Sequence, residues 1–155
     1  MNVKKNFPFF LLLLTILCIL CGCGKEEEQI LIMKPNENKI LVLCENSKDY
    51  IAKKELETIS VGTKDGEVCY GHFLDKALFN TYKDAAQTLK NITILEEGFT
   101  ENDNEYIFYK IEDGTYFEYN KIIQIENADV CILLRSTASQ TIAKESFDAL
   151  SFRGL

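Results

Sequence analysis

The spacing of hydrophobic residues predicts two amphipathic helices. Between about residues 75 and 90, apolar side chains recur every three or four positions, which is the spacing of one helix face. These side chains are Leu74, Ala77, Leu78, Tyr82, Ala85, Ala86 and Leu89. A second helix is expected at about 139–151, with Ser139 as its N-cap and an apolar face of Ile142, Ala143, Phe147 and Leu150. Both helices should pack against a sheet.

Short apolar runs predict the strands of the N-terminal half. Segments 30–33 and 39–44 flank a turn, and the second run is continuous, which is typical of a buried strand. A Lys-Asp-Gly turn at 64–66 then precedes another strand at 68–73, so these residues should contribute a hairpin. The segment 49–61 suits either a strand or a helix, and we favour the strand.

The C-terminal half carries the most regular strand pattern. Segments 104–111 and 115–125 predict a long hairpin closed by Asp-Gly. In the second arm, Phe117, Tyr119, Ile123 and Ile125 share one face, and Glu118, Asn120, Gln124 and Glu126 share the other. We therefore expect one buried face and one solvated face. The run 130–134 does not alternate, which predicts a central strand covered on both sides.

Together these elements predict one α+β domain at residues 30–155. Its core would be an antiparallel meander of about five to seven strands with two flanking helices. No internal repeat and no Pro/Gly-rich linker divides the segment, so a single domain is the simplest organisation.

The C-terminal half resembles PsbP-like domains, over about residues 67–155. The resemblance is carried by the hairpin 106–119, the strand 130–135, and a closing helix with Ser139, Glu145 and Phe147. PsbP-like domains combine antiparallel strands with flanking helices, and many bacterial examples are small secreted lipoproteins. The resemblance implies this fold and assigns no catalytic residue.

A targeting leader precedes the predicted domain. Lys4 and Lys5 are followed by an uncharged apolar run at 7–20, which has the length of the hydrophobic region of a signal peptide and is shorter than the roughly 20 residues that span a bilayer. The run ends in Leu-Cys-Gly-Cys at 20–23, which resembles the lipobox of bacterial lipoproteins, although Cys21 replaces the usual Ala, Ser or Thr. The resemblance implies a signal peptide at 1–22, cleaved after Gly22, and diacylglycerol attached to Cys23.

The leader thus predicts where the protein resides. Residues 23–29 would be the lipidated cysteine and a flexible acidic spacer, and the domain would face away from the cytoplasm at the cell membrane. An uncleaved N-terminal membrane helix is the alternative, and it also places the domain at a membrane. Whether the cell has one membrane or two stays open.

Composition and charge narrow the partners. The chain has 155 residues, of which 46% are apolar and 26% charged, a profile that excludes repeat, collagenous and wholly disordered proteins. Its formal charge is -7 and it has no cluster of Lys and Arg, so we expect no nucleic-acid partner. Removal of residues 1–22 leaves 15 basic and 24 acidic residues, so anionic lipid headgroups would not attract the domain.

The sequence contains no recognisable catalytic or metal-binding set. Cys44, Cys69 and Cys131 would remain after processing, and their apolar surroundings predict small buried hydrophobes, with one disulfide plus a free thiol as the alternative. His72 is the single histidine, and on a strand it would point away from Cys69. No zinc ligand set, phosphate-binding loop or serine-hydrolase motif is present, so we expect no cofactor.

One feature indicates binding. The predicted hairpin holds six aromatic residues on both of its faces, so one set should lie outside the main core, unless another element covers it. Tyr109 and Tyr116 are the first candidates for an exposed binding surface, and Tyr106 is the third. We therefore expect a non-enzymatic, lipid-anchored binding or accessory protein with an envelope protein as partner. A small envelope hydrolase that uses dispersed carboxylates and a solute-binding lipoprotein are the alternatives.

Overall fold

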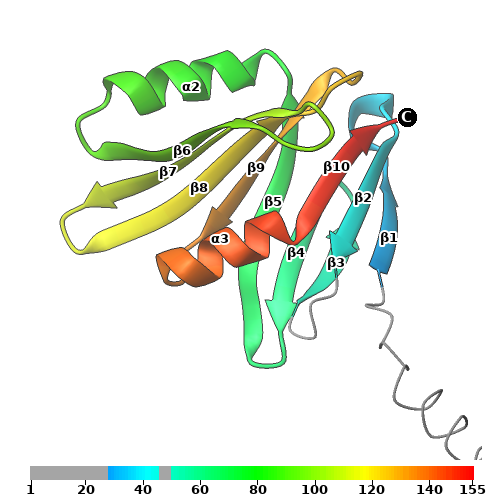
Figure 1. Ribbon diagram of the computed structural model, residues 1–155, viewed down its shortest axis with the longest axis horizontal. Coiled ribbons are helices and arrows are strands. Elements are labelled where there is room, and N and C mark those ends of the chain that lie inside the picture. Colours follow the sequence, from blue (N-terminus) through cyan, green and yellow to red (C-terminus); the bar gives the residue numbers. More distant parts are fainter. Residues whose placement is uncertain (1–27, 46–49) are drawn as a thin grey trace, which may run out of the picture.

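The computed structural model describes residues 28–45 and 50–155, which form two antiparallel sheets and two α-helices (Figure 1). The elements are β1 (Glu28–Met33), the 3-10 turn η1 (Pro35–Glu37), β2 (Ile40–Glu45), β3 (Ile51–Glu55), β4 (Thr58–Thr63), β5 (Gly66–Asp75), α2 (Leu78–Thr88), β6 (Ile92–Phe99), β7 (Glu105–Asp113), β8 (Tyr116–Gln124), β9 (Val130–Ser136), α3 (Gln140–Asp148) and β10 (Leu150–Gly154). The predicted signal peptide and Cys23 lie outside the described residues. No helix within the described ranges is long and apolar enough to cross a membrane.

The larger sheet has seven strands in the order β3-β4-β5-β9-β8-β7-β6. After β5 the chain crosses through α2 to the far edge, and it returns through β7 and β8 until β9 pairs with β5. The smaller sheet has the order β1-β2-β10. The α+β class and the antiparallel pairing are therefore confirmed. A single meander describes the larger sheet only approximately, because β9 closes onto β5 and the first two strands pair with the last.

The seven-stranded sheet separates two hydrophobic cores. On one face, it packs with α3 against the smaller sheet, where the rings of Phe73 and Phe152 meet edge to face with centroids 6.3 Å apart. On the other face, α2 covers a second core that includes Cys131 and Leu133. Because β9 is the central strand, alternate residues enter the two cores, and the covered strand expected at 130–134 is confirmed.

The solvated face expected on β8 is wrong. Asn120 and Ile122 are buried on the face that was predicted to meet water, and Glu118 is only 7% exposed. Ile122 packs in the core beneath α2, together with Phe79. Successive side chains of β8 do alternate between two faces, but α2 covers the second face. Alternation of apolar and polar residues therefore did not show that this face meets water.

Helix α2 is confirmed, although its buried stripe differs from the predicted one. The helix begins at Leu78, and Phe79 and Ala86 are buried while Leu78 and Leu89 are exposed. The predicted apolar positions spread over more than one face of the helix. Only the stripe that carries Phe79 contacts the sheet.

Helix α3 ends earlier than predicted. Ser139 caps it as expected, since its hydroxyl accepts a hydrogen bond from the backbone N–H of Ile142. The helix stops at Asp148, and Leu150 belongs to β10, where it pairs with Cys44 of β2. That pairing joins residues about one hundred positions apart, so no local pattern predicts it.

The favoured strand assignment within 49–61 is correct for the described part, as two strands with a turn between them. Leu56 stands in that turn, with φ 45° and a side chain that is 97% exposed. The predicted spacer is shorter than expected, because β1 already begins at Glu28. The Gln29 amide donates to the carbonyl of Ala52 and accepts from its N–H, so it links β1 to β3 and joins the two sheets.

Candidate functional site

The three candidate tyrosines do not form one surface. Tyr109 is buried under α2 at 2% exposure, so the alternative, in which another element covers this face of the hairpin, holds for Tyr109 and removes it from the candidate surface. Tyr116 is half exposed on the same face, towards the hairpin end. Tyr106 is three positions before Tyr109, and it therefore points to the opposite face, where it lines a cleft.

A cavity of about 620 Å³, here called the cleft, opens on the surface of the protein. It lies between the smaller sheet and α3 on one side and β6, β7 and β8 on the other. Asn104 helps to hold these walls together, because its amide donates to the carbonyl of Phe152 on β10 at 2.8 Å. The volume falls within the roughly 300–1,000 Å³ of ligand-binding sites.

Two lysines and two carboxylates of the cleft lining form a network of ion pairs, here called the floor network, in which only the Lys121 side chain is buried. Lys121 Nζ lies 2.6 Å from Asp148 Oδ1, and Lys144 Nζ lies 2.6 Å from Glu96 Oε2 and 3.1 Å from Asp148 Oδ2. The Tyr106 hydroxyl donates to Glu96 at 2.5 Å, and Lys121 Nζ lies 4.4 Å from the centre of the Tyr106 ring. This floor network carries equal numbers of positive and negative charges.

Hydrogen bonds and burial in the floor network shift the pKa values of Glu96 and Tyr106. The hydrogen bond from Lys144, aided by the one from Tyr106, lowers the pKa of Glu96. Burial, together with the bond to Glu96, raises the pKa of Tyr106 to about 12. Glu96 is therefore ionised and Tyr106 protonated near neutral pH. A carboxyl in that state is a poor proton donor.

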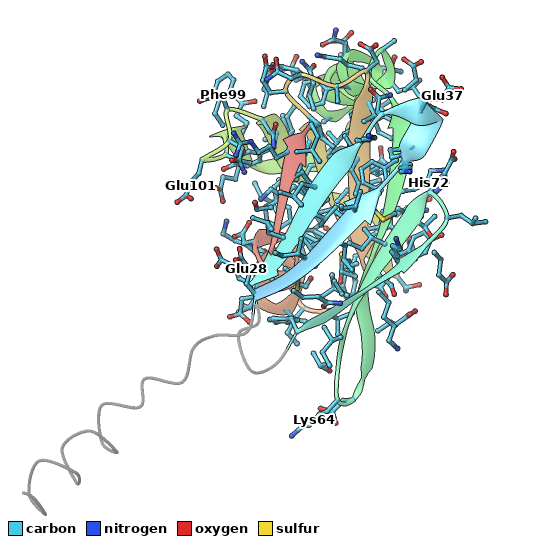
Figure 2. The ribbon with its side chains drawn as sticks, turned by 90° about the vertical axis from the view of Figure 1, so that its right-hand side faces the viewer. Glu28, Glu37, Lys64, His72, Phe99 and Glu101 are labelled. Atoms are coloured by element: carbon cyan, nitrogen blue, oxygen red, sulfur yellow. The ribbon has the colours of Figure 1, made fainter. Side chains whose placement is uncertain are left out.

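The rim of the cleft carries uncompensated negative charge. Glu28, Glu45 and Glu101 line it, and none of them has an ion pair among the described residues. Glu28 and Glu45 stand directly opposite each other on β1 and β2. Phe99 also lines the cleft and is 71% exposed. In Figure 2, Phe99, Glu101 and Glu28 lie along the same side of the molecule.

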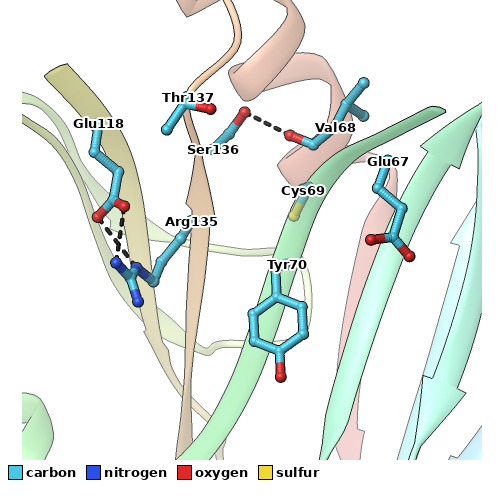
Figure 3. A pocket seen from close by; sticks show the side chains of 8 residues that line it. All are labelled: Glu67, Val68, Cys69, Tyr70, Glu118, Arg135, Ser136 and Thr137. Carbon is cyan, nitrogen blue, oxygen red and sulfur yellow. Dashed lines mark hydrogen bonds and ion pairs between the residues drawn. The ribbon is translucent and has the colours of Figure 1, made fainter. Parts of the chain in front are cut away.

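A second, shallower depression of about 290 Å³ lies on the opposite face of the large sheet and is drawn in Figure 3. At this hollow the Arg135 guanidinium donates two hydrogen bonds to the Glu118 carboxylate, from Nε to Oε1 at 3.1 Å and from Nη2 to Oε2 at 2.8 Å. The Tyr116 hydroxyl also donates to Glu118, at 2.7 Å. Tyr70, which is 46% exposed, is the cross-strand neighbour of Arg135. The hollow therefore places two half-exposed tyrosines beside a neutral charge pair.

Glu118 should make the folded state less stable in acid. Burial opposes ionisation of this carboxyl, but the hydrogen bonds from Arg135 and Tyr116 outweigh it and lower the pKa below the usual 4.5. The unfolded chain therefore takes up the proton first. The stabilisation is complete above pH 4.5 and is lost as the pH falls through the folded-state pKa. Urea denaturation from pH 7 to pH 3 should give a shallower loss for Glu118→Gln than for the wild type. Equal slopes for Glu118→Gln and an exposed-site control, Glu57→Gln, would contradict this assignment.

The three cysteines of the described ranges are buried thiols. Cys44, Cys69 and Cys131 are buried and free, as the apolar context predicted. Burial raises the pKa of Cys69 to about 12, so this thiol is not ionised near neutral pH. His72 is exposed on the opposite face of β5. Within the described ranges, no group of three or more His, Cys, Asp or Glu side chains is placed to hold a metal ion.

Sequence reasoning missed the charged residues of the floor network, although one signal for them was present. Lys121 occupies the same face of β8 as Tyr119 and Ile123, which was the predicted core face. A lysine on a core face needs a partner of opposite charge. That partner, Asp148, comes from α3 and could not be identified without the fold.

Comparisons with known proteins do not assign the chain to a family. The chain matches no protein-family model, no curated protein and no solved structure.

Proposed function

We propose that this protein is a lipid-anchored, non-enzymatic binding protein that holds an envelope protein in the cleft, outside the cytoplasm. The observation that carries the proposal is the position of Glu28, which lies on the rim of the cleft at the start of β1. Only five positions separate it from Cys23. A chain of five residues spans at most about 18 Å, so a lipid on Cys23 would keep the cleft close to the membrane surface.

The chemistry of the cleft supports binding. Its floor is a neutral set of ion pairs, its rim bears three carboxylates, and Phe99 offers an exposed aromatic ring. Exposed aromatic residues beside a concavity are typical of protein contacts. The resemblance of the C-terminal half to PsbP-like domains, with their many small lipoproteins, is consistent with this role and stays a prediction.

In-cell photo-crosslinking tests the proposal. A photoreactive amino acid at Phe99 should give a discrete crosslinked product in the membrane fraction. The same amino acid at Ile51 is the matched control, because Ile51 is also exposed, at 57%, but does not line the cleft. Crosslinked products of equal yield from Phe99 and Ile51, or no product from Phe99, would contradict the proposal.

The anchor is tested in the same cells. Cys23→Ala should move the protein from the membrane fraction to the soluble extracytoplasmic fraction or leave it unprocessed, because the lipid supplies the attachment. Fractionation and immunoblotting measure this distribution, with Cys44→Ala as the control. Processed protein of the mature size in the membrane fraction, at the wild-type level, would show for Cys23→Ala that the lipid on Cys23 is not the anchor.

A further inference from the structure

We infer that the occupant of the cleft is a basic chain segment, one that presents several Lys or Arg side chains from a partner protein at the membrane. This inference rests on the proposed function, since it names the chemistry that the same cleft would recognise. It is drawn from the distribution of charge between the floor and the rim.

The floor attracts neither cations nor anions strongly. Each lysine forms an ion pair with a carboxylate: Lys121 with Asp148, and Lys144 with Glu96, both at 2.6 Å. The rim, in contrast, adds three carboxylates that have no basic partner among the described residues. The described lining of the cleft therefore carries a net negative charge, and complementary charge on an occupant is positive.

Repulsion between two carboxylates of the rim lowers the stability of the unbound protein. Glu28 and Glu45 are directly opposite each other across β1 and β2, and like charges at such a position destabilise a sheet. Neither carboxylate has an ion pair within the described chain that would offset this repulsion. Local rules of this kind are typically broken at functional sites. A cation seated between the two carboxylates would relieve the repulsion on binding.

The geometry favours a chain segment over a metal ion or a lipid headgroup. Among the described residues, no three His, Cys, Asp or Glu side chains are grouped closely enough to hold a metal ion. An anionic headgroup would be repelled by the rim. Separate carboxylates along one cleft, with the Phe99 ring among them, instead match a segment whose cationic side chains alternate with apolar ones.

Fluorescence anisotropy with the purified full chain in nonionic detergent tests the inference. The probe is a fluorescein-labelled Lys-Leu-Lys-Leu-Lys-Leu peptide, and its counterpart carries Glu in place of Lys. Wild-type protein should bind the lysine peptide and not the glutamate peptide, with binding that weakens as salt rises. The triple variant Glu28→Gln, Glu45→Gln and Glu101→Gln should bind it about tenfold more weakly, through the loss of three charge contacts.

A charge-matched control separates the cleft from the general acidity of the chain. Glu37→Gln, Glu55→Gln and Glu57→Gln together remove the same charge from exposed positions outside the cleft, and this variant should bind within about twofold of wild type. As a readout without the peptide, Glu45→Gln alone should raise the melting temperature of the free protein. Equal weakening in both triple variants, or a lower melting temperature for Glu45→Gln, would overturn the inference.

The two proposals fail differently. If Phe99 captures a partner in cells but wild-type protein does not bind the lysine peptide, the proposed function stands and the basic segment is wrong. If the lysine peptide binds as expected but Phe99 captures nothing, the charge preference of the cleft stands and the proposed function fails.

Discussion

Phe147→Ala should lower the free energy of unfolding by about 3–5 kcal/mol, the usual cost of removing a fully buried phenylalanine. Phe147 is completely buried on the inner face of α3, and its ring meets that of Phe108 edge to face, with centroids 5.9 Å apart. Domains of this size are stable by about 5–15 kcal/mol, so the loss is a large share of the total. Urea denaturation measures it as a lower midpoint with an unchanged slope.

The same helix provides the matched control. Ile142 also lies on α3, but its side chain is 39% exposed, so Ile142→Ala should cost less than about 1 kcal/mol. A cost for Phe147→Ala no greater than that for Ile142→Ala would show that α3 does not carry the core as described.

Asn104→Ala should destabilise the fold by about 2–4 kcal/mol. Asn104 is 1% exposed; its amide donates to Phe152 on β10, and its side-chain carbonyl accepts from the N–H of Glu126, both at 2.8 Å. Alanine would leave both backbone groups without a partner, and each such buried group costs about 1–3 kcal/mol. The loss also releases β10 from the opposite wall of the cleft. Urea denaturation measures the cost.

Amide hydrogen exchange resolves the two bonds of Asn104. In Asn104→Ala, the N–H of Glu126 should exchange faster than in the wild type. In Asn104→Asp, the acceptor remains, so Glu126 should stay protected while the contact to Phe152 is lost. Asn102→Ala is the control, because the Asn102 amide makes only a part-buried bond of 3.2 Å to Ser151. Unchanged exchange of Glu126 in Asn104→Ala would refute the bridging role.

The local patterns predicted most of the elements because those elements are determined by nearby residues. The hairpin of β7 and β8 follows from alternation and from Gly114, whose φ of 61° suits a tight turn. Ser139 marks the start of α3 because a hydroxyl at that position satisfies a free backbone N–H. The uninterrupted apolar run in β9 indicated a central strand, and the run is buried in the structure.

The candidate site was less predictable from the sequence. Tyr106 was identified as a candidate, and it does line the cleft, but Tyr109 is covered by α2. No sequence pattern distinguishes the charged residues of the floor network, because each one resembles an ordinary charged residue within its own segment. These residues include Lys121, Glu96 and Asp148. They form one network only where β8, β6 and α3 meet.

By itself the sequence determined the α+β class, the positions of both helices, the long hairpin and the central strand, since neighbouring residues fix each of these. Only the tertiary structure decided that β10 joins β1 and β2, that α2 buries the second face of β8, and that Glu28 faces Glu45 at the rim of a cleft. The physical reason is that burial and ion pairing depend on which surfaces meet. Those surfaces come from residues far apart in the chain, and the spacing within one segment carries no information about the segment that will cover it.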